Sequence, residues 1–157
     1  MENKKLKWCF GLKDGLQIAE PNERLAKSYI EEEKGSLERA EKNFNDKDLL
    51  WATVVIYYAE YYALYSFLQK IGVKCENHFC SILAAGFLLG EDKTEIINRH
   101  KEKRIDAQYY IKVDQEDKVK AMLQEAKMSV STFDELISNL SEDNIKFYRN
   151  KITKEKD

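Results

Sequence analysis

Arginine, tyrosine and histidine are the residues in this chain that could act on a phosphate group or a proton. The stretch KEKRIDAQYY, residues 101–110, changes from basic to aromatic within about one helical turn. If the stretch is helical, Arg104 and Gln108 lie on one face with Tyr109 as a near neighbour. Such a group could form a phosphate site. The alternative interpretation is a surface arginine paired with a nearby acid such as Asp106, beside tyrosines that cap the core.

Basic residues concentrate around this stretch. Residues 93–104 contain five lysines and arginines and His100 against two glutamates, whereas residues 20–41 are rich in acids. An anionic ligand would choose the basic region, although a net charge of −2 gives no reason to expect tight, non-specific nucleic-acid binding. His100 projects about 100° away from Arg99 on a helix and is predicted to be a solvated residue. The candidate RNA- or nucleotide-binding residues are Arg99, Lys101, Lys103, Arg104 and Tyr109.

A cluster of tyrosines forms a second group. Their steps of one, three and four residues coat two adjacent faces of a helix, and this arrangement predicts core packing or a dimer interface. The alternative is a platform on which bases stack. Glu60 lies in the same run and is expected to pair with a cation or a hydroxyl, because an unpaired buried carboxylate is costly. The cluster consists of Tyr57, Tyr58, Tyr61, Tyr62 and Tyr65.

Cysteines and a histidine form a third group in the segment CENHFC. Cys75, His78 and Cys80, together with the distant Cys9, could supply a Cys₃His zinc site, but their spacing is not that of the usual paired knuckles. We expect small buried cysteines, no metal and no other cofactor. Three cysteines without an apolar signal sequence indicate reduced thiols and a cytoplasmic protein. His78 is either a helix cap or partner, or a site residue.

The elements that must position these groups are helical throughout, since no segment alternates with a period of two. A length of 157 residues, 34% charged and 43% hydrophobic, suits a soluble globular chain with one core. We expect residues 1–20 to form an N-terminal arm and residues 21–157 to form a single domain. The predicted fold is all-α: an antiparallel up-and-down bundle of four main helices with short additional helices.

Capping residues give the expected helix boundaries. The first helix follows Pro21, and Asn45 or Asp46 is expected to cap a second helix over about residues 48–71, which ends at Gly72.

The remaining helices follow the same signals. Asn77 is expected to cap a helix over residues 78–89, and another helix spans about residues 94–110. A heptad pattern predicts a long helix over about residues 114–140, and Ser141 begins a short last helix.

The segment Leu49–Leu68 is apolar nearly all round and about long enough to cross a bilayer. Glu60 at its centre and tyrosines throughout are not typical of a membrane span. We predict that it is the buried central helix of the bundle and that the protein does not enter a membrane.

The order of these features resembles that of the prokaryotic HEPN domains. The segments YYAEYYALYSFLQKIGVKCENHFCSI and RIDAQYY are similar to a branch with Tyr-Tyr-Ala in the second helix, a histidine after the next loop and a later Arg-x-x-Ala-Asp-Tyr-like element. The resemblance covers about residues 24–140. The residues that carry it are Tyr57, Tyr58, Ala59, Tyr61, Tyr62, Gly72, His78, Arg104 and Tyr109.

The resemblance implies a homodimeric helical bundle, often encoded beside a minimal nucleotidyltransferase that acts as antitoxin. Many members are ribonucleases that cut RNA without metal through an Arg-x₄₋₆-His motif from each subunit. In this chain Tyr109 stands after four intervening residues where the family has histidine. The ribonuclease motif is therefore degenerate, and an ordinary tyrosine with a pKa of about 10 is a poor base at neutral pH.

The resemblance implies an RNA- or nucleotide-binding or regulatory module of a toxin–antitoxin-type pair. One alternative is a metal-independent endoribonuclease with Arg104, His78 and Tyr109 as candidate catalytic residues. Another is a structural interaction subunit without nucleic-acid binding.

Overall fold

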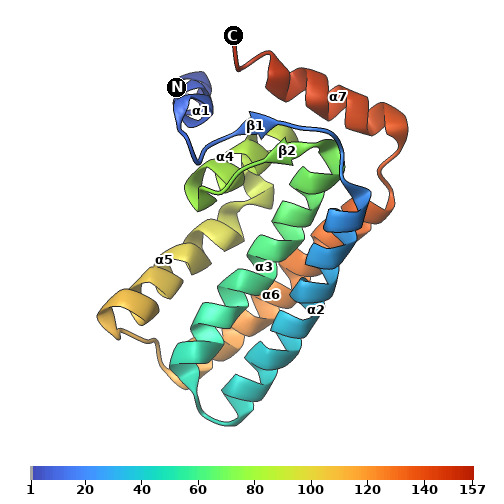
Figure 1. The fold of residues 1–157 in the computed structure, drawn as a ribbon. Coiled ribbons are helices and arrows are strands. Elements are labelled where there is room, and N and C mark those ends of the chain that lie inside the picture. The colour runs from blue at the N-terminus through green and yellow to red at the C-terminus, as the bar shows by residue number, and fades with distance from the viewer. Residues whose placement is uncertain (1) are drawn as a thin grey trace.

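Four long helices form the antiparallel up-and-down bundle in the computed structural model, which describes residues 2–157, with side chains from residue 4 onward (Figure 1). The predicted all-α fold is confirmed. In chain order the bundle helices are α2 (Glu23–Asn45), α3 (Leu49–Ile71), α5 (Glu95–Tyr110) and α6 (Glu116–Ser138).

Shorter elements cover one end of the bundle. Helix α4 follows α3 and leads through a 3₁₀ turn, η1, into α5, while α1 and α7 lie at the same end, where both chain termini are found (Figure 1). These elements are α1 (Glu2–Gly11), α4 (His78–Leu89), η1 (Glu91–Lys93) and α7 (Glu142–Thr153).

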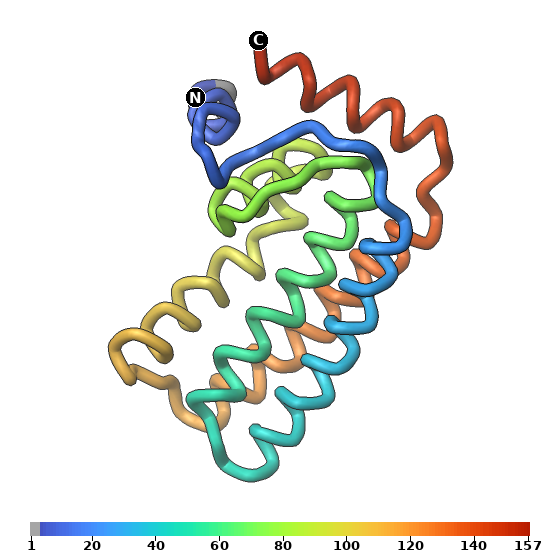
Figure 2. The backbone as a smooth tube through the Cα atoms, viewed as in Figure 1, coloured from blue at the N-terminus to red at the C-terminus, as the bar shows by residue number. Residues whose placement is uncertain are grey.

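A two-stranded antiparallel sheet ties the N-terminal segment to the bundle. Strand β1 (Gln17–Ile18) pairs with β2 (Val73–Lys74), so that Gln17 lies opposite Lys74. Figure 2 shows the chain between α1 and α2 crossing the end of the bundle beside the link from α3 to α4. The predicted arm thus contains a helix and a strand. Strands of two residues are too short to give a period-two pattern in the sequence.

The predicted residues Asn77 and Ser141 cap α4 and α7. The Asn77 side chain accepts a hydrogen bond from the backbone N–H of Cys80 at 3.1 Å, and Ser141 forms a capping box with Asn144. Gly72 ends α3 in the left-handed conformation, with φ of 80°, which glycine adopts without strain.

The cap of α3 differs from the prediction. Asp48, and neither Asn45 nor Asp46, accepts the hydrogen bond from the backbone N–H of Trp51, at 3.2 Å. Lys47, directly before this cap, adopts a positive φ of 63°, and the helix begins at Leu49.

Helix α3 lies at the centre of the bundle, as predicted, with α2, α5 and α6 packed around it. Ile56, Leu64 and Phe67 of this helix are fully buried. No helix within residues 2–157 is both long enough and apolar enough to cross a membrane. The apolar seam of α6 is buried as well, and its members are Val119, Leu123, Ala126, Val130, Phe133 and Ile137.

The prediction of three reduced thiols is wrong. Helix α1 packs against α4 and brings Cys9 to Cys80, and the two form a disulfide, whereas Cys75 is free and buried. The sulfurs of the disulfide cannot act as thiolate ligands, so the alternative Cys₃His zinc site, which also needed His78, is excluded. In the described part of the chain no three histidines, cysteines or acids are placed to hold a metal ion.

Candidate functional site

Arg104 is a buried cation on the face of α5 that packs against α3. Its side chain is only 9% exposed, and its guanidinium carbon lies 4.9 Å from the ring centroid of Tyr57 and 5.8 Å from that of Tyr58. One terminal nitrogen donates to the amide oxygen of Gln108 at 3.3 Å, but Nε has no hydrogen-bond partner within residues 2–157. No described carboxylate forms an ion pair with it, so its charge is not compensated locally.

His78 reaches the same tyrosines from the first turn of α4. Its Nδ1 lies 2.8 Å from the hydroxyl of Tyr57, and its ring stacks on that of Tyr61 with centroids 3.9 Å apart. Tyr57 therefore contacts both Arg104 and His78. His78 and Arg104 thus approach the same tyrosine from two different helices, α4 and α5.

The environment of His78 keeps the ring neutral. Burial lowers the pKa of His78 to about 4, and the positive charges of Arg104 and Lys101 contribute in the same direction. At neutral pH the imidazole therefore carries one proton, on either Nδ1 or Nε2.

The hydroxyl of Tyr57 decides which nitrogen carries that proton. Burial raises the pKa of Tyr57, so its hydroxyl keeps its hydrogen, and among the described residues Nδ1 of His78 is its one hydrogen-bond acceptor. A buried hydroxyl that fails to donate loses a hydrogen bond, so Tyr57 donates to Nδ1 and the histidine proton lies on Nε2. In this tautomer His78 offers a hydrogen-bond donor to a ligand.

The predicted binding residues do not all converge on this site. Lys101 lies near it: its ammonium is 5.3 Å from the ring centroid of Phe79, and its charge acts on His78. Arg99 instead pairs with Glu125 at 2.5 Å, on the side of α5 that faces α6.

Two further predicted residues lie apart from Arg104. Lys103 pairs with Asp114 at 2.9 Å. Tyr109 is 66% exposed at the end of α5, next to the exposed Tyr110 and Ile111. The cluster of Arg104 with Tyr57, Tyr58 and His78 therefore does not include Lys103 or Tyr109.

His100 is buried, and the prediction that it is solvated is wrong. It is 1% exposed, with Nδ1 2.5 Å from a carboxylate oxygen of Glu60 and Nε2 3.4 Å from Glu125. His100 lies four residues before Arg104, so both face α3. Burial raises the pKa of Glu60, while the hydrogen bond and charge of His100 lower it. The predicted pairing of Glu60 is confirmed, and the pair fixes α5 against α3 one turn from Arg104.

The tyrosines divide into two rows. Tyr57, Tyr61 and Tyr65, here called the inner row, are buried, and their hydroxyls bind His78, the Ser81 hydroxyl at 3.0 Å and the Cys75 N–H at 3.0 Å. Core packing is thus confirmed for this row.

The outer row consists of Tyr58 and Tyr62 of α3 and Tyr29 of α2, and all three are half-buried. Tyr62 packs beside both others, with ring centroids 6.0 Å from Tyr58 and 5.8 Å from Tyr29. No local sequence signal indicates that Tyr29, which lies on another helix, joins the cluster.

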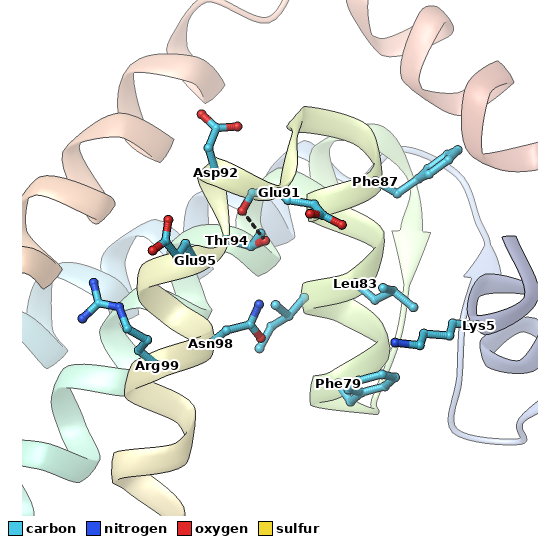
Figure 3. Close-up of a pocket in the computed structure, with 12 residues that line it drawn as sticks. Lys5, Phe79, Leu83, Phe87, Glu91, Asp92, Thr94, Glu95, Asn98 and Arg99 are labelled. Atoms are coloured by element: carbon cyan, nitrogen blue, oxygen red, sulfur yellow. Dashed lines mark hydrogen bonds between the residues drawn. The ribbon is translucent and has the colours of Figure 1, made fainter. Parts of the chain in front are cut away.

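A groove of about 700 Å³ lies between α1, α4 and α5, apart from the cluster of Arg104, Tyr57, Tyr58 and His78 (Figure 3). Phe79 and Leu83 form its α4 wall, Lys5 extends toward it from α1, and Asn98 lines it from α5. Arg104 and His78 do not line it, and Arg99, which does, points away from α4 in Figure 3.

Neither the models of known families nor the curated proteins compared with this chain match it. The likeness to HEPN domains therefore rests on the residues and motifs of the chain itself.

Proposed function

We propose that this protein is a HEPN-like RNA- or nucleotide-binding module that holds a phosphate group between Arg104 and His78. The observation that carries the proposal is the buried guanidinium of Arg104, which has an unpartnered Nε and no carboxylate partner among residues 2–157. A buried charge without a counterion is costly, and an anion that pairs with it recovers part of that cost.

The chemistry of the pair favours a phosphate as this anion. A guanidinium presents a fork of N–H donors that matches two oxygens of a phosphate. A neutral His78 with its proton on Nε2 adds a donor, and Lys101 adds a positive charge that acts on the same histidine. Arg104 and His78 then both donate hydrogen bonds, and neither accepts a proton from the ligand. Such a site binds a phosphate ester and leaves it intact.

The remaining parts of the proposal rest on the HEPN resemblance. We propose a homodimer that works in a toxin–antitoxin-type pair with a minimal nucleotidyltransferase. The exposed end of α5, formed by Tyr109, Tyr110 and Ile111, supports a protein partner, because contiguous exposed aromatic and aliphatic side chains are typical of interaction surfaces.

A second candidate function is metal-independent cleavage of RNA. The observation that favours it is that Arg104 and His78 contact the same tyrosine, so that a cation and an imidazole adjoin one site. Cleavage requires the other tautomer, in which Tyr57 accepts from Nδ1 and Nε2 is free to take a proton. The third candidate, a structural interaction subunit, requires no nucleic-acid binding.

The test is incubation of the purified protein with labelled single-stranded RNA in EDTA, with retention and cleavage scored separately. Arg104→Ala is the variant, and Arg24→Ala, an exposed arginine of α2, is the matched control. Retention without cleavage, lost in Arg104→Ala and kept in the control, is the expected result. Cleavage lost in Arg104→Ala supports the ribonuclease, and no retention by the unmodified protein contradicts the proposal and leaves the structural subunit.

A further inference from the structure

The outer row of tyrosines has unused binding capacity beside the proposed phosphate site. Each inner-row hydroxyl has a partner in the protein, whereas no residue from 2 to 157 hydrogen-bonds the hydroxyls of Tyr29, Tyr58 and Tyr62. Burial raises the pKa of Tyr29 and of Tyr62, so these hydroxyls remain neutral donors at neutral pH. The outer row therefore presents aromatic surface and free hydroxyls that packing alone does not require.

A groove of about 280 Å³ runs along this row. It follows α3 from Tyr58 to Tyr65, a rise of about 10 Å for seven helical residues, and ends at Glu76 in the loop before α4. The side chains that form most of its wall are Tyr29, Tyr58, Tyr61, Tyr62, Tyr65 and His78.

The two ends of the groove differ in charge. At one end the guanidinium carbon of Arg104 lies 5.8 Å from the ring centroid of Tyr58, and Lys101 acts on His78. At the other end the carboxylate of Glu76 lines the groove. A ligand that fits must be anionic at the Arg104 end, flat and aromatic in the middle, and a hydrogen-bond donor at the Glu76 end.

We infer that the groove holds the base of the nucleotide whose phosphate binds Arg104, an inference that rests on the proposed function. Bases stack on aromatic side chains whatever their sequence, and the outer row supplies such surfaces. A carboxylate accepts hydrogen bonds from exocyclic amino groups, so Glu76 selects cytosine, adenine or guanine over uracil. The phosphate site provides affinity, and the groove provides the preference for single-stranded, amino-bearing bases.

The first experiment uses the unmodified chain, so it does not depend on a variant that folds. A short RNA that contains 5-iodocytidine is bound, irradiated and digested, and the cross-linked peptide is identified by mass spectrometry. The groove predicts cross-links to Tyr58, Tyr62 or Tyr29. Cross-links confined to Tyr109 or Tyr110 at the end of α5 overturn the inference and leave the proposed RNA binding standing.

The second experiment separates the base from the phosphate. Tyr62→Leu is predicted to weaken binding of a cytidine oligonucleotide by roughly ten- to a hundred-fold, because one base loses its stacking partner. The slope of log Kd against log salt is expected to stay the same, since no phosphate contact is removed. Tyr110→Leu, exposed and outside the groove, is the control and is expected to bind normally.

Oligonucleotides and nucleotides then identify the ligand. An abasic residue at the cross-linked position is expected to weaken binding to the unmodified protein and to have no further effect on Tyr62→Leu. If cytidine monophosphate displaces the oligonucleotide from the unmodified protein but not from Tyr62→Leu, a free nucleotide is a sufficient ligand. If only oligonucleotides compete, the ligand is RNA. Binding that depends on Arg104 but not on Tyr62 contradicts the base-binding groove and leaves the proposed phosphate site standing. No binding to any probe contradicts the proposed function as well.

Discussion

Arg104 lies over the ring of Tyr57, with its guanidinium carbon 4.9 Å from the ring centroid, while the hydroxyl of the same tyrosine holds Nδ1 of His78 at 2.8 Å. One side chain of α3 thus connects a cation of α5 to an imidazole of α4. The tyrosine excludes water from one face of the guanidinium and fixes the histidine tautomer. The site accordingly depends on three helices being held together.

The lowered pKa of His78 makes the stability of the protein depend on pH in a defined range. Its value of about 4, against an ordinary 6.5, means that the unfolded chain binds a proton more readily than the folded protein does. Stability therefore falls as the pH is lowered from about 6.5 towards 4. Glutamine is not protonated in this range. When the pH is lowered from about 7 to about 5, the melting temperature of His78→Gln is therefore expected to fall by less than that of the unmodified protein. Equal losses in both proteins would contradict the buried, neutral histidine.

The buried Glu33 makes the stability of the protein depend on pH in the opposite direction. It is 1% exposed on α2, and burial together with the adjacent carboxyl group of Asp134 on α6 raises its pKa from 4.5 to about 9. The folded protein retains a proton that the unfolded chain has lost, so stability falls as the pH rises from 4.5 towards 9. Glu33→Gln imitates the protonated acid and is expected to melt higher than the unmodified protein at about pH 8. Glu31→Gln, exposed on the same helix, is the control, and parallel pH curves for the two glutamine variants would refute the assignment.

The pair of His100 and Glu60 is expected to stabilise the contact between α5 and α3. His100→Leu leaves a buried carboxylate without its partner and is predicted to lower the free energy of unfolding by about 3–5 kcal/mol. The double variant His100→Leu, Glu60→Leu removes the buried acid and is expected to regain most of that loss. Urea denaturation measures both. A single variant as stable as the unmodified protein would show that Glu60 does not need His100.

The disulfide between Cys9 and Cys80 holds α1 on α4. Cys9→Ser is expected to lower the free energy of unfolding by about 2–4 kcal/mol, since the unfolded chain gains freedom when the cross-link is absent. A reductant is expected to lower the melting temperature of the unmodified protein and to leave that of the variant unchanged. Alkylation of the denatured, unreduced protein should label Cys75 alone, and labelling of all three cysteines would contradict the disulfide.

Local signals allowed most of the fold to be predicted. Asn77, Gly72 and Ser141 act within one turn of their own helices, so their roles follow from neighbouring residues. The burial of α3 follows from its composition, because a helix that is apolar on every side must be covered by others.

The errors concern contacts between distant residues. His100 has charged neighbours on its own helix, but α5 packs against α3 and brings it to Glu60, forty residues earlier in the chain. Cys9 and Cys80 are separated by 71 residues, and nothing near either one indicates the other. The meeting of Arg104 with His78 could be hypothesised from a family resemblance, but the role of Tyr57 between them depends on how α3, α4 and α5 pack.

The most direct test of the phosphate site observes the Nε–H group of Arg104. Its ¹⁵N–¹H resonance is assigned by its absence from the spectrum of Arg104→Lys, and a cytidine oligonucleotide is then added to the unmodified protein. Because Nε has no partner among the described residues, we expect a large shift of this resonance and slower exchange with water when a phosphate oxygen binds. An unchanged Arg104 resonance while the oligonucleotide binds would place the nucleic acid elsewhere and contradict the phosphate site at Arg104.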